Sequence, residues 1–144
     1  MKEKIIVISI LSYYAKQIFA GTKHFEFRKS PIKNEDLNKP VYVYSAKEDK
    51  KIIGKFEVSK VHKGNLDEIL KITGYDKRQD KGEIENYFKN SETCFALELS
   101  CVNKFTCPLS LSEMRKIQSN ITMPQYYTYI YSNNPLFDKI KKLK

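Results

Sequence analysis

The sequence has few of the residues that build metal centres and disulfide frameworks. Its 144 residues include three cysteines and two histidines. Cys94, Cys101 and Cys107 do not show the paired spacing of metal ligands, and His24 and His62 supply little more. We therefore expect no metal site and no cofactor, and we expect the three thiols to be reduced.

Long apolar runs are also missing. No segment approaches the length of a membrane span, and residues 2–10 are too short and too β-branched for a signal-peptide core, so they predict a first strand. We expect a cytoplasmic protein with no membrane partner. The length predicts one domain over residues 1–144, with its own core and no internal repeat.

Arginine is scarce although the chain is basic. The net charge is +9, with 26 Lys and Arg residues. Such a charge favours a polyanionic partner such as RNA, but a Lys-rich composition that is also rich in Ile, Asn and Tyr is equally typical of an A/T-rich genome. The three arginines, Arg28, Arg78 and Arg115, are of special interest because a guanidinium makes bidentate contacts that lysine cannot.

Local patterns predict a mixture of strands and helices. Alternation predicts strands over residues 41–47, 52–58 and 93–102, the second ending or bulging near Ser59 and Lys60. Helical spacing predicts helices over residues 12–20, 66–73, 83–88 and 110–117. Ser12 is the expected cap of the first, Gly74 ends the second, and Ser110 or Ser112 caps the last. Residues 76–82 are expected to form a mobile loop.

One stretch, Gly21 to Lys29, places a lysine, a carboxylate and an arginine close together. Alternation from Phe25 directs Glu26 and Arg28 to one face of a strand, and Phe25 and Phe27 to the other. Lys23 precedes that strand in a turn. The cluster is either the wall of a cleft or an ordinary surface ion pair.

The order of several such segments resembles the ASCH domain family, a branch of the PUA-like superfold. The pattern Gly-x-Lys-x-x-Glu-x-Arg-Lys is followed by Val-Tyr-Val-Tyr-Ser at 41–45 and Ile-Ile-Gly-Lys-Phe-Glu-Val at 52–58. Residues 109–115 and 124–125 resemble later landmarks of the family. The resemblance implies an α+β fold, a small mixed β-barrel of about five to six strands with flanking helices. It also implies a cleft lined by Lys23 and Glu26.

Family members bind RNA or modified nucleosides, so the resemblance implies a nucleic-acid-binding module. Lys23 and Arg28 would act as donors, Glu26 would accept from an exocyclic amine, and a tyrosine would stack on an unpaired base. For most tyrosines, packing in the core is the alternative. The candidate binding residues are Lys23, Glu26, Arg28, Tyr13, Tyr44, Ser45 and Tyr126.

Whether the protein is an enzyme stays open at this point. One branch of the family removes the acetyl group from acetylated cytidine with a lysine, a threonine three residues later and a distant glutamate. Lys23 matches the lysine, Glu26 stands in the threonine position, and Glu83 and Glu85 are candidates for the distant glutamate. A ribonuclease is the other possibility, with Glu26 as general base and Lys23 and Arg28 stabilising charge.

Overall fold

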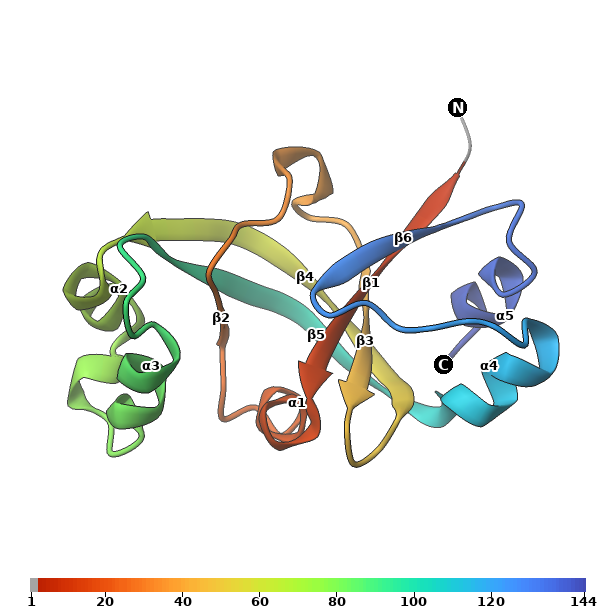
Figure 1. Ribbon diagram of the computed structural model, residues 1–144, viewed down its shortest axis with the longest axis horizontal. Helices are drawn as coiled ribbons and strands as arrows, with labels where there is room; N and C mark the ends of the chain where they lie inside the picture. The colour runs from red at the N-terminus through yellow and green to blue at the C-terminus, as the bar shows by residue number, and fades with distance from the viewer. Residues whose placement is uncertain (1–2) are drawn as a thin grey trace. The chain divides into compact units, whose positions relative to one another are not determined.

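The computed structural model describes residues 3–144, in which strands and helices alternate irregularly (Figure 1). The strands are β1 (Lys4–Leu11), β2 (Phe25–Arg28), β3 (Val41–Ala46), β4 (Lys51–Gly64), β5 (Cys94–Ser110) and β6 (Tyr127–Tyr131). The helices are α1 (Ser12–Phe19), α2 (Leu66–Thr73), α3 (Lys81–Tyr87), α4 (Leu111–Ile117) and α5 (Phe137–Lys141), with 3₁₀ turns η1 (Asn34–Asp36) and η2 (Tyr75–Lys77). The predicted first strand is β1, and Lys2 lies outside the described residues. No helix among the described residues is long and apolar enough to cross a membrane.

The strands form a six-stranded mixed sheet in the order β2-β5-β4-β3-β1-β6. β1 pairs in parallel with β3, whereas β1–β6, β3–β4 and β2–β5 are antiparallel. The α+β class and the strand number predicted from the sequence are confirmed. A closed barrel has no edge strands, so a sheet with edge strands is open and the predicted barrel is not closed. In the described part of the chain β2 and β6 are edge strands.

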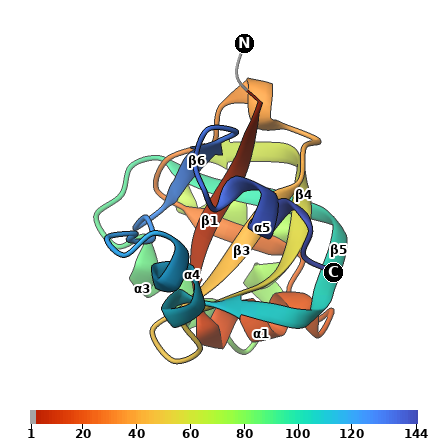
Figure 2. The ribbon, with the colours of Figure 1, turned by 90° about the vertical axis from the view of Figure 1, so that its right-hand side faces the viewer.

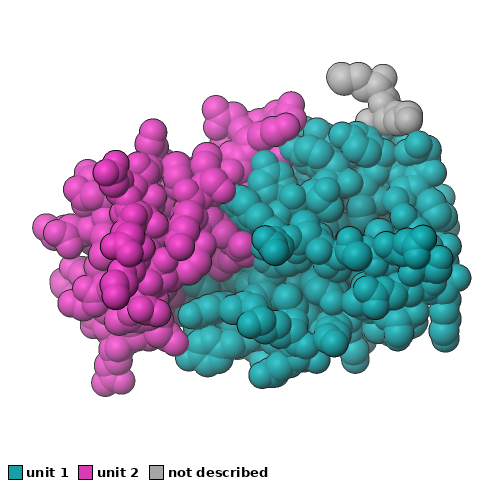
Figure 3. Space-filling model, in the orientation of Figure 1, with its two compact units in different colours: residues 1–23, 39–57, 101–144 teal, residues 24–38, 58–100 magenta. Residues whose placement is uncertain are grey.

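The chain divides into two compact units, coloured separately in Figure 3. Unit 1 comprises residues 1–23, 39–57 and 101–144, and unit 2 comprises residues 24–38 and 58–100. Both β4 and β5 contribute residues to each unit. The single domain expected from the length stays a prediction.

Unit 1 is organised around β1. Six consecutive residues of this strand are buried, the near-continuous apolar run typical of a strand covered on both faces. Helix α5 packs against the face of β1 that carries Ile5 and Val7 (Figure 2). The core residues on this side are Ile5, Val7, Tyr42, Tyr44, Ile52, Phe105, Leu109, Met114, Ile130, Leu136, Phe137 and Ile140.

Unit 2 is built on aromatic edge-to-face contacts. The Phe27 ring on β2 lies 4.9 Å from Tyr75 and 6.1 Å from Phe88, measured between centroids. Such T-shaped pairs add stability beyond the buried area. In Figure 1, α2 and α3 lie together, and both helices contact η2. As predicted, α2 ends at Gly74, whose φ of 78° is the left-handed conformation that glycine adopts readily.

Three local predictions need correction. Ser12 does not cap α1, because its hydroxyl donates to the Ala46 carbonyl instead. β4 does not end near Ser59 and Lys60 but continues to Gly64, and the Ser59 hydroxyl donates across to the Glu98 carbonyl of β5. The alternative, a bulge at these residues, stays a prediction. The expected loop at residues 76–82 is shorter than predicted, because it contains the last two residues of η2 and the first two residues of α3.

Candidate functional site

Lys23 is held at the end of α1 in unit 1. Gly21, at a φ of 84°, turns the chain out of the helix, and the amides of Thr22 and Lys23 both donate to the Gln17 carbonyl. The Lys23 residue is only 3% exposed, and its amine lies 5.3 Å from the centre of the Tyr14 ring. A cation over an aromatic face is stabilised by the ring quadrupole. Lys23 is thus a fixed, buried cation, not a mobile surface lysine.

Ser45, another candidate in unit 1, belongs to a buried hydroxyl network. Its Oγ lies 2.9 Å from the Ser12 Oγ and donates to the Asp49 carboxylate at 2.7 Å. The Asp49 amide in turn donates to the Ser12 Oγ at 3.1 Å. The network ties the β3–β4 hairpin to the start of α1. This geometry favours a structural role for Ser45.

The three predicted stacking tyrosines of unit 1 differ in environment. Tyr44 lies in the core, where burial raises the pKa of its phenol and the Arg115 charge partly opposes that shift. Tyr13 is 59% exposed, and Tyr126 is half-buried with its ring 4.9 Å from that of Tyr127. Tyr13 and Tyr126 therefore have ring surface that a base can reach, whereas Tyr44 does not.

In unit 2, Glu26 and Arg28 form an ion pair on one face of β2. The Nη2 and Nε atoms of Arg28 lie 2.7 Å and 2.9 Å from the same carboxylate oxygen, Oε2 of Glu26. Glu26 is only 6% exposed. Phe27 points to the opposite face and enters the core, as the alternation predicts, with Phe25 packed against that core. The two charges are far more enclosed than an ordinary surface pair.

Two tyrosines stand near this pair in unit 2. Burial raises the pKa of Tyr87, an effect that the Arg28 charge opposes and the Glu26 charge adds to. Burial also raises the pKa of Tyr75, where Arg78 opposes the shift and the Glu26 and Glu83 charges add to it. Sequence reasoning missed both tyrosines. Tyr87 follows Glu83 by four residues in α3, a spacing that puts both on one helix face and is the signal that would have found it.

The two candidate distant glutamates are distinguished by their positions on α3. Glu83 is half-buried and close enough to Tyr75 to affect its phenol, whereas Glu85 is exposed. Residues two apart on a helix point in nearly opposite directions. Glu83 is therefore the better candidate. We call Glu26, Arg28, Tyr75, Glu83 and Tyr87 the Glu26 cluster.

Arg78, noted for its rarity, is also close to the Glu26 cluster. Its Nε and Nη2 atoms each lie 2.9 Å from one of the Asp80 oxygens, and the guanidinium stacks 4.2 Å from the Tyr75 ring centre. The Asp80 hydrogen bond raises the pKa of Arg78 above its ordinary value. This fork lies within residues 76–82, whose expected mobility stays a prediction.

The open six-stranded α+β sheet with short flanking helices defines the fold class, and comparison with known proteins identifies the family. The model of the ASCH domain matches residues 8–105. The protein belongs to the ASCH domain family.

Among curated relatives, an ASCH domain-containing ribonuclease from Zymomonas mobilis is 25% identical over 124 residues, which cover 86% of this chain and 82% of the relative. The crystal structure of ASCH from Zymomonas mobilis superposes with a TM-score of 0.81 at 22% identity, covering 96% of this chain and 95% of that one. The N-terminal domain of McrB from Staphylothermus marinus matches with a TM-score of 0.57 at 17% identity, over 95% and 92% of the two chains. These structural matches establish the fold.

Proposed function

We propose that this protein binds single-stranded RNA and that the Glu26 cluster is part of the binding surface. The observation that carries the proposal is the enclosed Glu26–Arg28 pair. Burying two opposite charges costs desolvation, and apolar residues of similar size would serve stability as well or better. A charged pair at such a position is therefore better explained by recognition of a ligand than by stability alone.

The chemistry of the cluster suits an unpaired nucleotide. Arg28 offers a planar set of donors to phosphate, and Glu26 is an acceptor for an exocyclic amine. Tyr87 is 38% exposed, so it offers ring surface for stacking, and the Lys29 amine lies 5.1 Å from its centre. The net charge of +9 supplies the general attraction to a phosphate backbone.

Cleavage of the bound RNA is the second candidate function, favoured by the relative that is named a ribonuclease and matched over most of both chains. In this reaction Glu26 takes the proton of a ribose 2′-hydroxyl, whose oxygen bonds to the adjacent phosphorus while the bond from phosphorus to the 5′-oxygen breaks. The leaving 5′-oxygen takes a proton from water, and Glu26 returns its proton to the hydroxide that remains. Arg28 would stabilise the charge that develops on the phosphate oxygens. The products would be a 2′,3′-cyclic phosphate and a free 5′-hydroxyl.

Hydrolysis of acetylated cytidine is not proposed. Glu26 stands where that branch carries threonine, and its carboxylate is bound to Arg28. We expect little or no acetate release from acetylated cytidine. Turnover that Lys23→Ala abolishes would contradict this.

Binding is tested by fluorescence anisotropy of a labelled single-stranded RNA across a salt series. If about three to five phosphates are neutralised, log affinity falls with log salt with a slope of roughly −2 to −4. Glu26→Gln and Arg28→Ala are compared with Glu85→Gln, a control on the exposed side of α3, after circular dichroism has shown that each variant is folded. RNA binding that is insensitive to salt, or equal in all four proteins, contradicts the proposal.

Cleavage is tested with the same RNA by resolving the product ends. If Glu26 is the base, Glu26→Gln lowers the cleavage rate of RNA that is already bound, measured at saturating protein, by roughly 10²-fold or more, whereas Glu85→Gln cleaves as wild type does. If the wild-type protein binds RNA without cutting it, the proposed binding function stands and the ribonuclease activity is contradicted.

A further inference from the structure

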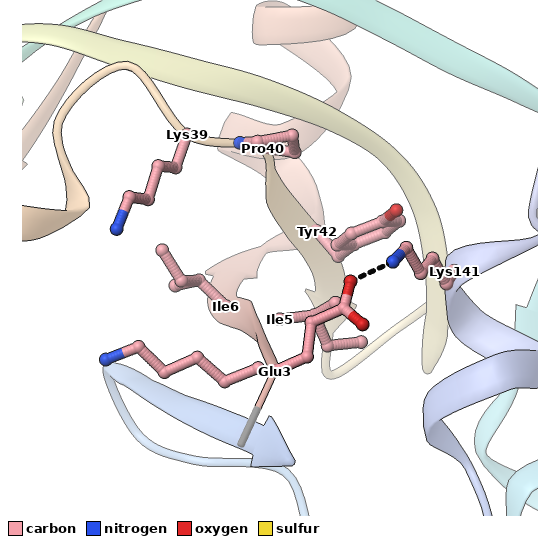
Figure 4. Close-up of a pocket in the computed structure, with 8 residues that line it drawn as sticks. Glu3, Ile5, Ile6, Lys39, Pro40, Tyr42 and Lys141 are labelled. Carbon is pink, nitrogen blue, oxygen red and sulfur yellow. Dashed lines mark hydrogen bonds and ion pairs between the residues drawn. The ribbon is translucent and has the colours of Figure 1, made fainter. Parts of the chain in front are cut away.

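Unit 1 contains a pocket whose lining includes none of the candidate binding or catalytic residues (Figure 4). It lies at the first residues of β1 and β3, which run in parallel, and β1 continues from there for roughly 23 Å before α1 begins. Its volume is about 210 Å³. This is smaller than the roughly 300–1,000 Å³ of pockets for drug-sized ligands, so it suits one small ring system.

The walls of the pocket are apolar. They are formed by Ile5 and Ile6 from β1, Pro40 before β3, and the ring of Tyr42. Tyr42 is largely buried, and burial raises the pKa of its phenol while the Lys141 charge opposes the shift. The hydroxyl therefore stays protonated and can donate a hydrogen bond at neutral pH.

Charged groups stand around these apolar walls. Lys141 of α5 is paired with Glu3, and Figure 4 shows this pair beside Tyr42, with the Lys39 amine over on the Ile6 side of the pocket. Within residues 3–144 the Lys39 amine has no ion pair or hydrogen bond. The Lys4 amine is fixed 3.8 Å from the centre of the Tyr129 ring on β6. Three lysines and one glutamate give the lining a net charge of +2 (3 − 1).

We propose that this pocket binds a nucleotide. Lys39 and Lys4 hold the phosphate, the base lies against the apolar walls, and Glu3 accepts a hydrogen bond from the polar edge of the base. The apolar walls match the faces of the base, the lysines match the phosphate, and the Glu3 carboxylate matches a donor on the edge of the base. The site is independent of the Glu26 cluster and takes either a free mononucleotide or one nucleotide of an RNA strand.

Calorimetric titration with 5′-AMP, adenosine and inorganic phosphate tests the assignment. AMP is expected to bind more tightly than either of its parts, because only AMP occupies both the walls and the cation end. Lys39→Glu should weaken AMP binding by about tenfold or more, since it replaces a charge-assisted contact with repulsion. Lys139→Glu on α5 makes the same charge change at an exposed residue that does not line the pocket, and should change Kd by less than about twofold.

A short single-stranded RNA, titrated into the same proteins and into Glu26→Gln, separates the two sources of the nucleotide. AMP binding that Lys39→Glu weakens and Glu26→Gln leaves unchanged supports a mononucleotide site, whatever becomes of the Glu26 cluster. No AMP binding, but RNA binding weakened more by Lys39→Glu than by Lys139→Glu, supports a site for one nucleotide of a strand. Equal affinity for AMP and phosphate overturns the assignment, as do equal effects of the two lysine variants on both AMP and RNA.

Discussion

The two units bury charge in different ways. In unit 1 the buried Lys23 amine lies against the ring of Tyr14, and the Ser12 and Ser45 hydroxyls are tied to Asp49. Unit 2 encloses a complete ion pair, Glu26 and Arg28, with tyrosines nearby. A cation over an aromatic face is stabilised by the ring quadrupole, whereas opposite charges in a buried pair compensate each other. The charged side chains of one short motif therefore differ in kind, because the Lys23 amine lies against an aromatic ring whereas Glu26 and Arg28 neutralise each other.

The largest effect is expected from the aromatic core of unit 2. Phe27→Ala should lower the free energy of unfolding by about 3–5 kcal/mol, because it removes the ring that contacts both Tyr75 and Phe88 and leaves a cavity. Urea denaturation measures the loss. Phe27→Leu, which fills more of the space, should cost clearly less. Equal costs for the two variants would contradict the cavity explanation, because the space that leucine refills would then recover no stability.

The next effect separates the enclosed pair of unit 2 from an exposed pair of unit 1. Glu26→Gln should cost roughly 2–3 kcal/mol, because the Arg28 charge stays enclosed without its partner. Glu48→Gln, which breaks the Lys16–Glu48 pair whose side chains are 61% and 78% exposed, should cost less than about 1 kcal/mol. Both are measured by urea denaturation at pH 7. Similar small costs would mean that water screens the Glu26–Arg28 pair as well.

A smaller effect is expected in the hydroxyl network of unit 1. Ser45→Ala should cost about 1–2 kcal/mol, because Asp49 loses a hydrogen-bond donor in a part-buried site. Ser112→Ala, which leaves the Ser110 cap of α4 in place, serves as the exposed control. If Ser45→Ala lowers RNA affinity without changing stability, Ser45 belongs to the binding surface after all.

The smallest effect concerns alkaline pH. The pKa values of Tyr75 and Tyr87 in unit 2, like those of Tyr42 and Tyr44 in unit 1, are raised above 10 by burial. The unfolded chain therefore loses these protons first, so stability is full below about pH 10 and falls as the pH rises beyond it. Melting temperatures from pH 8 to 11 measure the fall. Tyr75→Phe should reduce its steepness, and an unchanged slope would show that Tyr75 does not contribute.

Local signals were sufficient for several elements. The β3–β4 hairpin, the end of α2 at Gly74 and the capping box of Ser110 with Glu113 all follow from residues adjacent in the chain. Where a local signal gave a wrong prediction, the side chain is hydrogen-bonded to a residue far away in the chain. Ser12 has the chemistry of a helix cap, but its hydroxyl donates its hydrogen bond to the Ala46 carbonyl, 34 residues away in the chain. In the same way, Ser59 is held in the sheet by Glu98.

The candidate site shows the same division. Alternation along the sequence was enough to predict that Glu26 and Arg28 share a face of a strand and that Phe27 points the other way into a core, because side chains alternate with a period of two. The order of the motifs also predicted the family, and the match to the ASCH domain over residues 8–105 confirms it. The enclosure of this pair, the nearness of Tyr75 and Tyr87 to it, and the nearness of Glu83 to Tyr75 depend on the folded chain. The burial of Glu26 and Arg28, and the groups that lie near them, depend on segments about fifty residues away in the chain. No local pattern encodes which distant segments pack against this strand.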